Sequence, residues 1–490
     1  MDYGFLKSGT DVRGVASDLG GKQVELDNAA VYDISAAFVV WCVNKFEKPA
    51  GELKIALGHD SRITADRISD CVKSALVNAG VTVIDCGMSS TPAMFMTTVD
   101  LHSDAAIQIT ASHHPFDRNG LKFFIGTGGL EGSDIAEILV LASNGEECIS
   151  EKKGEVCAID YMKDYAARLR NMIIQEVGRG EKPLADYHII VDAGNGVGGF
   201  YANDVLAPLG ADVSGSQFLE PDGMFPNHIP NPENKQAIDS ICEAVKKNNA
   251  DFGVIFDTDV DRAGCVDSDG NEINRNRLIA IASYIALCDK KGGTIVTDSV
   301  TSDGLKKYIE QNLGGVHYRY RRGYKNVINK AIELCNEGVD CPLAIETSGH
   351  AALRENYFLD DGAYLATKII IELAKGTDIK ALLSKMEMPS EEAEYRFNIK
   401  ANDFRNYGQK VIEDLEKFAL SNSKYTVADD NREGIRVSTK QGWFLLRLSV
   451  HDPVMPMNFE SKEKGGIEIM KQELKPFFES FTHLEIPKEF

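Results

Sequence analysis

Short apolar segments separated by Gly-rich or polar turns recur along the chain, and they predict buried β-strands. Clear examples are residues 53–58, 187–192, 252–257 and 342–346. Because apolar residues stand at successive positions, both faces of each strand are expected to be covered, as in a mostly parallel sheet flanked by helices. Helical patterns such as Ile238 to Asn248 alternate with these strands. The pattern therefore predicts an α/β fold.

The C-terminal region follows a different pattern, which predicts an α+β unit. Strands are expected at 395–399, 434–438 and 443–448, and a helix over 403–420 stands between the first two. This grouping of strands around one helix does not repeat the strand–helix alternation of the preceding chain. A separate C-terminal domain is therefore expected.

Chain length and charged segments set the expected number of domains. The chain has 490 residues, which favours about three domains and accommodates four. Its hydrophobic content of 43% and charged content of 26% are ordinary for a globular protein. Two charged stretches with few apolar residues, 143–155 and 386–394, are interpreted as linkers between domains.

Charge and cysteine usage exclude several classes of function. The formal net charge of −21 argues against nucleic acid as a partner, because such a partner needs a basic surface. A small anionic substrate remains compatible if basic residues gather in one cleft. Neither a signal peptide nor an apolar run of the roughly 20 residues that a membrane span needs is visible, so no membrane association is expected. Ten scattered cysteines without paired CxxC spacing predict reduced thiols in a cytoplasmic protein.

The first candidate for chemistry is the turn TASHHP at residues 110–115, which follows an apolar segment. A serine in a tight turn after a buried strand can present its hydroxyl to a cleft, and His113 beside Ser112 can assist proton transfer. Lys122 lies close enough in sequence to add a cation. A surface loop with two solvated histidines explains this spacing equally well.

The second candidate is DTDVDR at residues 257–262. If this segment is extended, alternate side chains face the same side, so Asp257, Asp259 and Asp261 converge. A hard divalent cation with oxygen ligands, such as Mg²⁺, relieves the repulsion among them. Arg262 can then neutralise a phosphoryl oxygen. An acidic surface turn is the alternative, which the preceding apolar strand makes less favourable.

Two further loops contain groups suited to a sugar phosphate. In ETSGH, residues 346–350, Glu346 and Ser348 can form a fork for vicinal sugar hydroxyls, although a turn with a capping serine explains them equally well. In RLSVHDP, residues 447–453, a guanidinium, a hydroxyl and loop amides can hold a phosphate. A strand followed by an ordinary turn explains that segment nearly as well.

Taken together and in this order, these segments resemble the α-D-phosphohexomutase superfamily, the phosphoglucomutases and phosphomannomutases. The resemblance covers nearly the whole chain. The serine turn is similar to the family's TASHNP, residues 257–262 to its DGDxDR, and residues 346–350 to its EMSGH. Further segments match the family patterns NGxK, PDGxFPNH and NPE, at Asn119–Lys122, Pro221–His228 and Asn231–Glu233. Two Gly-rich loops, Gly9–Gly14 and Asp192–Gly196, have low specificity by themselves.

The resemblance implies three α/β domains with mixed sheets and a C-terminal α+β domain, arranged in a heart shape around a central cleft. A monomer or a dimer is expected. The implied domains are residues 1–152 with the serine loop, 153–272 with the metal loop, 273–387 with the sugar loop and 388–490 with the phosphate loop.

The resemblance also implies roles for individual residues by position. Ser112 would be phosphorylated in the resting enzyme and would hold Mg²⁺ together with Asp257, Asp259 and Asp261. Lys122 would be a candidate acid or base. The other implied site residues are Arg13, His113 and Arg262 at the transferring phosphoryl group, and Glu346, Ser348, His350, Arg321, Arg447, Ser449 and His451 at the substrate.

The implied reaction moves a phosphoryl group between two hydroxyls of a hexose. The group passes from Ser112 to the free hydroxyl of a hexose 1- or 6-phosphate, which gives a hexose 1,6-bisphosphate. That intermediate must turn end over end before it returns the other phosphate to the serine. A site that accepts both orientations must grip groups that the turn exchanges, chiefly hydroxyls 3 and 4 and the distal phosphate.

Departures from the family patterns bear on the substrate more than on the reaction. The phosphate loop is usually RxSGTEP or RxSNTEP, whereas Val450 and His451 stand at its two small hydrogen-bonding positions. Thr347 replaces the usual Met, and His114 the usual Asn. Glucose and mannose phosphates are favoured, and glucosamine phosphate stays open. Two alternatives are a paralogue that binds sugar phosphates as a sensor or regulator, and a metal-assisted phosphatase in which water replaces the returning hydroxyl.

Overall fold

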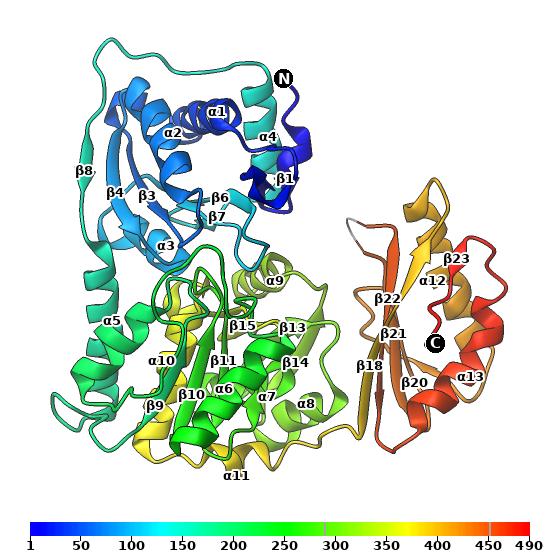
Figure 1. Cartoon of the computed structure of the whole chain (residues 1–490). Coiled ribbons are helices and arrows are strands. Elements are labelled where there is room, and N and C mark those ends of the chain that lie inside the picture. The colour runs from blue at the N-terminus through cyan, green and yellow to red at the C-terminus, as the bar shows by residue number, and fades with distance from the viewer. Residues whose placement is uncertain (289–290, 450–451) are drawn as a thin grey trace. The chain divides into compact units, whose positions relative to one another are not determined.

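The computed structural model describes residues 1–288, 291–449 and 452–490 (Figure 1). The chain forms two compact units. Unit 1 comprises Met1–Ile285 and Ser348–Lys380, and unit 2 comprises Ala286–Thr347 and Ala381–Phe490. The family-derived division into four domains stays a prediction.

The first sheet of unit 1 is mixed. Its strands run in the order β1 (Lys7–Ser8), β2 (Asp11–Val15), β6 (Arg118–Ile125), β5 (Ala105–Ile109), β3 (Lys54–His59), β4 (Thr82–Met88) and β8 (Val156–Ala158), and β7 (Gly128–Gly129) pairs with β6. The central strands β5, β3 and β4 are parallel, whereas β6 is antiparallel to both β5 and β2. The short apolar segment predicted at 53–58 is thus a central strand of a mixed sheet.

One core fills the space between this sheet and three helices. Helices α1 (Asn28–Phe46), α2 (Ala65–Asn78) and α4 (Gly132–Ser143) contribute to it, and Phe38 packs against Phe123 with ring centroids 4.4 Å apart. Helix α3 (Thr91–Asp100) packs against β3, β5 and β6 but supplies no residue to this core. The sheet is therefore covered by helices, as the uninterrupted apolar strands indicated.

Helix α1 is apolar around its circumference because it lies between α2 and α4 (Figure 1). Asp27 caps its N-terminus by accepting a hydrogen bond from the backbone amide of Ala30. Among the described helices, α1 is the one long and apolar enough to be a candidate membrane span, and 56% of its most apolar window is buried inside the protein. A core helix has the same length and composition.

The second sheet of unit 1 has the order β12 (Glu272–Ile273), β11 (Ala263–Asp267), β10 (Phe252–Phe256) and β9 (Ile189–Asp192). Strand β10 is parallel to β9 and antiparallel to β11. Helix α6 (Lys235–Asn248) packs on this sheet through Ile241 and Val245. Helix α10 (Gly362–Lys375) packs against β10, β11 and α5 (Tyr161–Val177), so the second chain segment of unit 1 returns to this sheet. Strands β16 (Ala351–Leu353) and β17 (Leu359–Asp360) form an antiparallel pair in that segment.

Unit 2 contains a parallel arrangement and an antiparallel sheet. Strand β13 (Thr294–Asp298) pairs in parallel with β14 (Val316–Tyr320) on one side and β15 (Leu343–Ile345) on the other. Helix α9 (Tyr324–Asn336) packs on these strands. The remaining helices of the chain around this region are α7 (Arg275–Leu287), α8 (Asp303–Lys307) and α11 (Ile379–Leu383).

The antiparallel sheet of unit 2 has helices α12 (Phe404–Leu420) and α13 (Gly466–Phe478) on one face (Figure 1). Its strand order is β19 (Thr426–Val427), β20 (Ile435–Ser438), β21 (Gly442–Leu446), β22 (Val454–Ser461), β18 (Glu391–Ile399) and β23 (Leu484–Glu485). Aromatic rings form its core, with Phe397 4.7 Å from Phe478 and 4.9 Å from Phe490 between ring centroids. The α+β pattern predicted for the C-terminal region is confirmed.

The linker predicted over residues 386–394 is wrong for its last residues, because β18 already begins at Glu391. Its charged residues alternate with Ala393 and Tyr395, and Ala393 lies opposite Phe459 of β22. Alternating apolar and charged residues are typical of a strand with one solvated face. The many charged residues of this segment made it look like a linker and hid the alternation of apolar and charged positions.

We predict that Phe397→Ala lowers the free energy of unfolding of the antiparallel sheet by about 3–5 kcal/mol, because it leaves a cavity among packed rings. Trp41 lies in α1 and Trp443 in β21, and the chain has two tryptophans. In a Trp41→Phe background, Trp443 fluorescence during denaturant titration therefore reports on this sheet. The exposed Lys410→Ala on α12 is the control, with an expected change below about 0.5 kcal/mol. Equal midpoints for the two variants would contradict the prediction.

Candidate active site

Ser112 lies in a tight turn directly after β5 and has a left-handed backbone conformation, with φ of 49°. A residue other than glycine at such a φ costs on the order of 1 kcal/mol or more, so its surroundings must hold it. The side-chain oxygen of Thr110 accepts a hydrogen bond from the Ser112 amide at 2.8 Å and donates one to Asp60 at 2.7 Å. The turn is thus fixed by buried hydrogen bonds.

The Ser112 hydroxyl lies between a carboxylate and a guanidinium. It donates to Asp257 Oδ2 at 2.9 Å and accepts from Arg262 Nη2 at 2.8 Å. Arg262 Nη2 also donates to His113 Nδ1 at 2.6 Å. Burial, and then the positive charge of Arg262, lowers the pKa of His113 to about 2. His113 is therefore a neutral imidazole whose Nδ1 accepts a hydrogen bond.

Asp257, Asp259 and Asp261 come together between β10 and β11, and all three are almost completely buried. One carboxylate oxygen from each lies within 4.8 Å of the others. The convergence is confirmed, but the expected extended conformation is wrong. The residues form a turn in which Val260 has φ of 66° and donates from its amide to the Asp257 carbonyl. The turn lets three carboxylates meet without a strand.

Two cations lie against these carboxylates. Lys122 Nζ, on β6, lies 2.5 Å from Asp261 Oδ2 and 3.2 Å from Asp259 Oδ2. Arg262 lies 2.9 Å from Asp257. Burial and the neighbouring Asp261 raise the pKa of Asp257 well above its usual value. Burial also opposes ionisation of Asp261, but Lys122, His350 and Arg262 outweigh it and hold that pKa low.

The donor set of this cluster fits a divalent cation. Three carboxylates face two cationic side chains, so one negative charge is left over when all ionise. Asp259 Oδ1 and Asp261 Oδ1 are buried and accept no hydrogen bond from the described residues. Charges 4.8 Å apart repel by about 3 kcal/mol at an effective dielectric constant of 20. Oxygen ligands that carry negative charge are those that Mg²⁺ and similar hard ions prefer.

Three more predicted site residues lie in unit 1. Arg13, on β2, is paired with Gly120 of β6, and its Nη2 lies 2.7 Å from Asp11 Oδ2. His350 Nε2 lies 3.7 Å from Asp261 Oδ1, and His350 Nδ1 lies 2.9 Å from the Ser348 hydroxyl. Burial lowers the pKa of His350 to about 3, although Asp261 opposes this.

The remaining predicted site residues lie in unit 2. Glu346 Oε1 accepts a hydrogen bond from the Gly323 amide at 2.5 Å. Arg321 is exposed and donates from Nε to the Arg432 carbonyl at 3.3 Å. Its neighbour Arg322 lies 4.0 Å from Asp298, a buried carboxylate that also accepts from Thr347 at 2.6 Å. Asp298 was missed by the sequence analysis, although it ends the strand β13.

The phosphate-loop residues that the structure describes are Arg447 and Ser449. Arg447 is 9% exposed, its Nη2 lies 3.8 Å from Glu394 Oε2, and its Nε donates no hydrogen bond to a described residue. The Ser449 hydroxyl accepts from the Asp452 amide at 3.3 Å. Val450 and His451 lie outside the described residues, so the predicted role of His451 stays a prediction.

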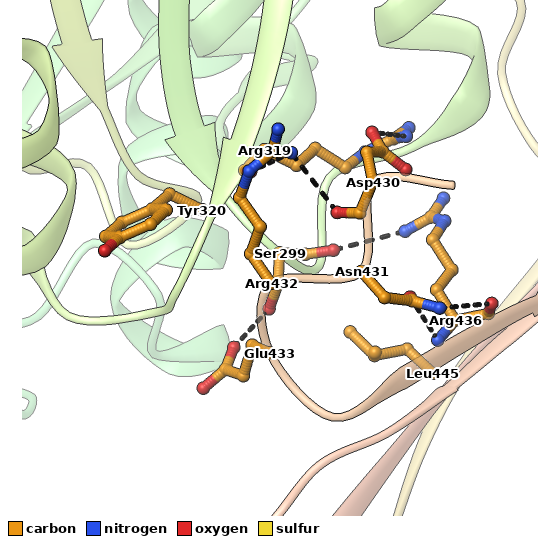
Figure 2. A pocket seen from close by; sticks show the side chains of 9 residues that line it. All are labelled: Ser299, Arg319, Tyr320, Asp430, Asn431, Arg432, Glu433, Arg436 and Leu445. Carbon is orange, nitrogen blue, oxygen red and sulfur yellow. Dashed lines mark hydrogen bonds and ion pairs between the residues drawn. The ribbon is translucent and has the colours of Figure 1, made fainter. Parts of the chain in front are cut away.

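A small polar pocket in unit 2 lies between the ends of β13 and β14, the loop 430–434 and the start of β20 (Figure 2). Arg436 Nη2 donates to Asp303 at 2.9 Å, and its guanidinium lies 3.5 Å from the Trp443 ring centroid. Glu433 accepts hydrogen bonds from the Ser299 hydroxyl and the Arg322 amide. The Arg321 side chain and the Arg322 amide thus tie this segment to residues 432–433, just before β20 of the antiparallel sheet.

Asp60 and Arg62, which follow β3, belong to the site although the residue pattern did not predict them. Both side chains are completely buried, with Arg62 Nε 3.3 Å from Asp60 Oδ2. Arg62 donates to backbone carbonyls of the loop that contains Ser112. The only sequence feature that could have indicated these two residues is a charged turn after a strand. Such turns are common at protein surfaces, so the feature is not specific.

Three family models match successive parts of the chain. They describe the phosphoglucomutase/phosphomannomutase α/β/α domain I over residues 7–147, domain II over 163–270 and domain III over 274–388. The order of the three matches is that of the motifs in the sequence.

Individual proteins are similar over nearly the full chain. A phosphoglucomutase of Neisseria gonorrhoeae is 29% identical over 479 residues, 97% of each chain. A phosphoglucomutase/phosphomannomutase of Thermococcus kodakarensis is 30% identical over 436 residues, 86% of this chain and 90% of its own. A crystal structure of a phosphoglucomutase/phosphomannomutase family protein from Burkholderia thailandensis superposes with a TM-score of 0.79, 25% identity and 98% coverage of both chains. The chain therefore belongs to the phosphoglucomutase/phosphomannomutase family of the α-D-phosphohexomutase superfamily and is a mutase that transfers phosphate intramolecularly.

Proposed function

We propose that this enzyme interconverts hexose 1-phosphate and hexose 6-phosphate through a phosphoserine at Ser112 and a hexose 1,6-bisphosphate. The observation that supports this proposal is the placement of the Ser112 hydroxyl between Asp257 and Arg262, beside three buried carboxylates. A hydroxyl whose proton is directed at a carboxylate and whose oxygen is held by a guanidinium is well placed to exchange a phosphoryl group.

The first half-reaction transfers the phosphoryl group from Ser112 to the substrate. The free hexose hydroxyl attacks phosphorus, its proton leaves, and the bond from phosphorus to the serine oxygen breaks. Arg262, already on that oxygen, stabilises its developing negative charge. The proton of the hexose hydroxyl ends on the serine oxygen, so the step balances. Lys122, whose Nζ lies inside the carboxylate cluster, is the proposed acid or base: as an amine it would accept the first proton, and as an ammonium it would donate one to the departing serine oxygen. Return of the other phosphate to Ser112 reverses these steps on the turned intermediate.

Asp257, Asp259 and Asp261, with an oxygen of Ser112, would hold Mg²⁺, which supplies positive charge that offsets the phosphoryl oxygens when it is bound. Arg13 and His113 are proposed to flank the transferring group. Phosphoserine carries about −1.5 to −2 charges near neutral pH. The cationic groups around the Ser112 hydroxyl would balance that negative charge.

The substrate groups that the end-over-end turn exchanges need their own contacts. We assign hydroxyls 3 and 4 to Glu346 and Ser348, with His350 beside the serine. Arg321, Arg447, Ser449 and His451 are assigned to the distal phosphate. Among these, Arg447 is buried, and a buried guanidinium is a strong partner for a phosphate. Relatives named phosphoglucomutase or phosphomannomutase/phosphoglucomutase support glucose and mannose as the sugars.

We predict that purified protein with Mg²⁺ and catalytic glucose 1,6-bisphosphate converts glucose 1-phosphate, mannose 1-phosphate or both to the 6-phosphates. Coupled assays for each sugar, with glucosamine 1-phosphate in parallel, measure this. Turnover of glucosamine 1-phosphate alone would reject the sugar assignment. Absence of turnover with all three, together with tight binding, would indicate a sugar-phosphate-binding protein, and release of inorganic phosphate would indicate a phosphatase.

Ser112→Ala is expected to abolish mutase turnover, with a loss of at least about 1000-fold, because no residue then accepts the phosphoryl group. Intact-mass measurement after incubation with glucose 1,6-bisphosphate should show one added phosphoryl group in the wild type and none in the variant. Ser74→Ala, at an exposed serine of α2, is the matched control and should behave as wild type. A fully active Ser112→Ala enzyme would refute the phosphoserine assignment.

Asp259→Asn is expected to weaken Mg²⁺ binding by more than about 10-fold, because it removes one of three charged oxygen ligands. Calorimetric titration of the metal-free protein with Mg²⁺ measures the change without any dependence on turnover. Asp269→Asn, in an exposed turn of the same sheet, is the control and should leave the affinity unchanged. Identical titrations for the two variants would rule out the metal role of the cluster.

A further inference from the structure

Arg62 is a charged residue without contact with the Ser112 hydroxyl or the carboxylate cluster, yet it is buried as completely as a core residue. Its side chain has no exposed surface, and the residue as a whole is 2% exposed. Burying a guanidinium is costly unless its charge and its N–H groups are satisfied. The contacts that satisfy it therefore show what the residue is for.

Arg62 donates almost all of its hydrogen bonds to the serine loop. Nη1 donates to the carbonyls of Pro115 and Arg118, each at 2.8 Å. Nη2 donates to the carbonyls of His114, at 2.6 Å, and of Ser112. One rigid planar fork thus holds four carbonyl groups within a loop of seven residues, a geometry that guanidinium provides and ammonium does not.

Asp60 completes this arrangement from the other end of the loop. Its Oδ2 lies 3.3 Å from Arg62 Nε and accepts from the Thr110 hydroxyl at 2.7 Å. Thr110 in turn accepts from the Ser112 amide at 2.8 Å. Ser112 is therefore held through its own amide by Asp60 and Thr110, and through its own carbonyl by Arg62. Both anchors act on Ser112, which has a left-handed φ.

The segment 221–228 covers Arg62 from the side of the second sheet. The Phe225 ring centroid lies 5.3 Å from the guanidinium carbon, within cation–π range. Gly223 packs so closely that an added Cβ would lie 2.4 Å from the Ile63 amide nitrogen. No side chain other than hydrogen fits there. The PDGMFPNH motif, which the reaction itself leaves without a role, is thus part of this packing.

This segment is connected to the aspartate turn, residues 257–261, through the loop that contains Asn195. The Asp222 amide donates to the Asn195 carbonyl at 2.9 Å, and Asn227 Nδ2 donates to Asn195 Oδ1 at 2.8 Å. Two residues further along the Asn195 loop, the Val197 amide donates to the Thr258 carbonyl at 2.9 Å. Thr258 stands between Asp257 and Asp259. Segment 221–228 therefore contacts both Arg62, which binds the serine loop, and the Asn195 loop, which binds the backbone of the aspartate turn.

We propose that Arg62 is a positioning residue for the phosphoryl transfer: with Phe225 packed on it, it holds the serine loop so that the Ser112 hydroxyl meets Asp257 and Arg262. This inference rests on the proposed role of Ser112. The loop must keep that oxygen in place while the residue gains and loses a dianionic group. A buried cation on the carbonyl side of the loop also stabilises the charge of the phosphorylated state.

Arg62→Lys tests the proposal, because lysine keeps the charge but cannot direct donors at four carbonyls. We expect kcat and the single-turnover rate of Ser112 phosphorylation by glucose 1,6-bisphosphate to fall about 100-fold, the loss typical of a misplaced reacting group. Substrate affinity and calorimetric Mg²⁺ affinity should change less than about 3-fold, since neither involves Arg62 directly. Rates are normalised to the folded fraction, measured by near-ultraviolet circular dichroism.

Arg67→Lys is the matched control. Arg67, on α2, also donates to two backbone carbonyls, those of Ala16 and Leu26, but not to the serine loop. Its substitution should change kcat less than about 3-fold. Equal kcat values for Arg62→Lys, Arg67→Lys and wild type would overturn the proposal. So would a loss of activity in Arg62→Lys that only matches a loss of folded protein.

Phe225→Leu keeps the proposal testable if Arg62→Lys does not fold. It leaves all four carbonyl contacts of Arg62 in place and removes only the ring on its guanidinium. We expect kcat to fall about 3- to 30-fold with unchanged Mg²⁺ affinity, the range of a buried cation–π contact. An unchanged kcat in this variant would overturn the proposal. If wild type itself does not turn over, the proposed function fails, whereas an active wild type with unaffected variants rejects this inference alone.

Discussion

The concentration of negative charge at the turn between β10 and β11 is the constraint on which the rest of unit 1 depends. Three aspartates there are almost fully buried, with one oxygen of each within 4.8 Å of the others. Such a cluster is unstable unless cations balance it. Lys122 comes from β6 of the first sheet, and Arg262 comes from the turn itself. The ion pair between Lys122 and Asp261 therefore joins the first sheet to the second. The serine hydroxyl lies where the two sets of charges meet.

Further contacts hold the aspartate turn and Ser112 in place around the cluster. Asp257 is held by the hydroxyl and the guanidinium in front of it, and the turn is fastened from behind by the Gly362 amide, which donates to the Val260 carbonyl. Ser112 is fastened by Thr110 and Arg62, which contact its own amide and carbonyl. Ser112 and the aspartate turn are therefore supported partly through backbone atoms. Backbone support keeps side-chain oxygens available for substrate and metal.

In unit 2, buried arginines stand beside buried carboxylates such as Asp298 and Glu346. Arg319 and Arg436 share the carboxylate of Asp303, and the Arg436 guanidinium stacks on Trp443. Arg447 is also buried, and its Nη2 lies 3.8 Å from Glu394 Oε2. An arginine that is desolvated but weakly paired is a good partner for a phosphate, whereas a tightly paired one is structural. This distinction separates Arg447, proposed to bind phosphate, from Arg436, which ties β20 to Asp303 and the Ser299 carbonyl.

The sequence by itself determined the α/β class, the C-terminal α+β sheet and the loops in which the reactive side chains stand. These are local properties: an uninterrupted apolar run specifies a buried strand, and the polar residues that follow must lie at its end. Only the tertiary structure decided which loops meet. Ser112 and Asp257, 145 residues apart, are joined because β5 and β10 end at the same place in unit 1. Arg62 escaped sequence analysis because its partners are backbone carbonyls, which every residue has, so no residue pattern could reveal that four of them surround one guanidinium.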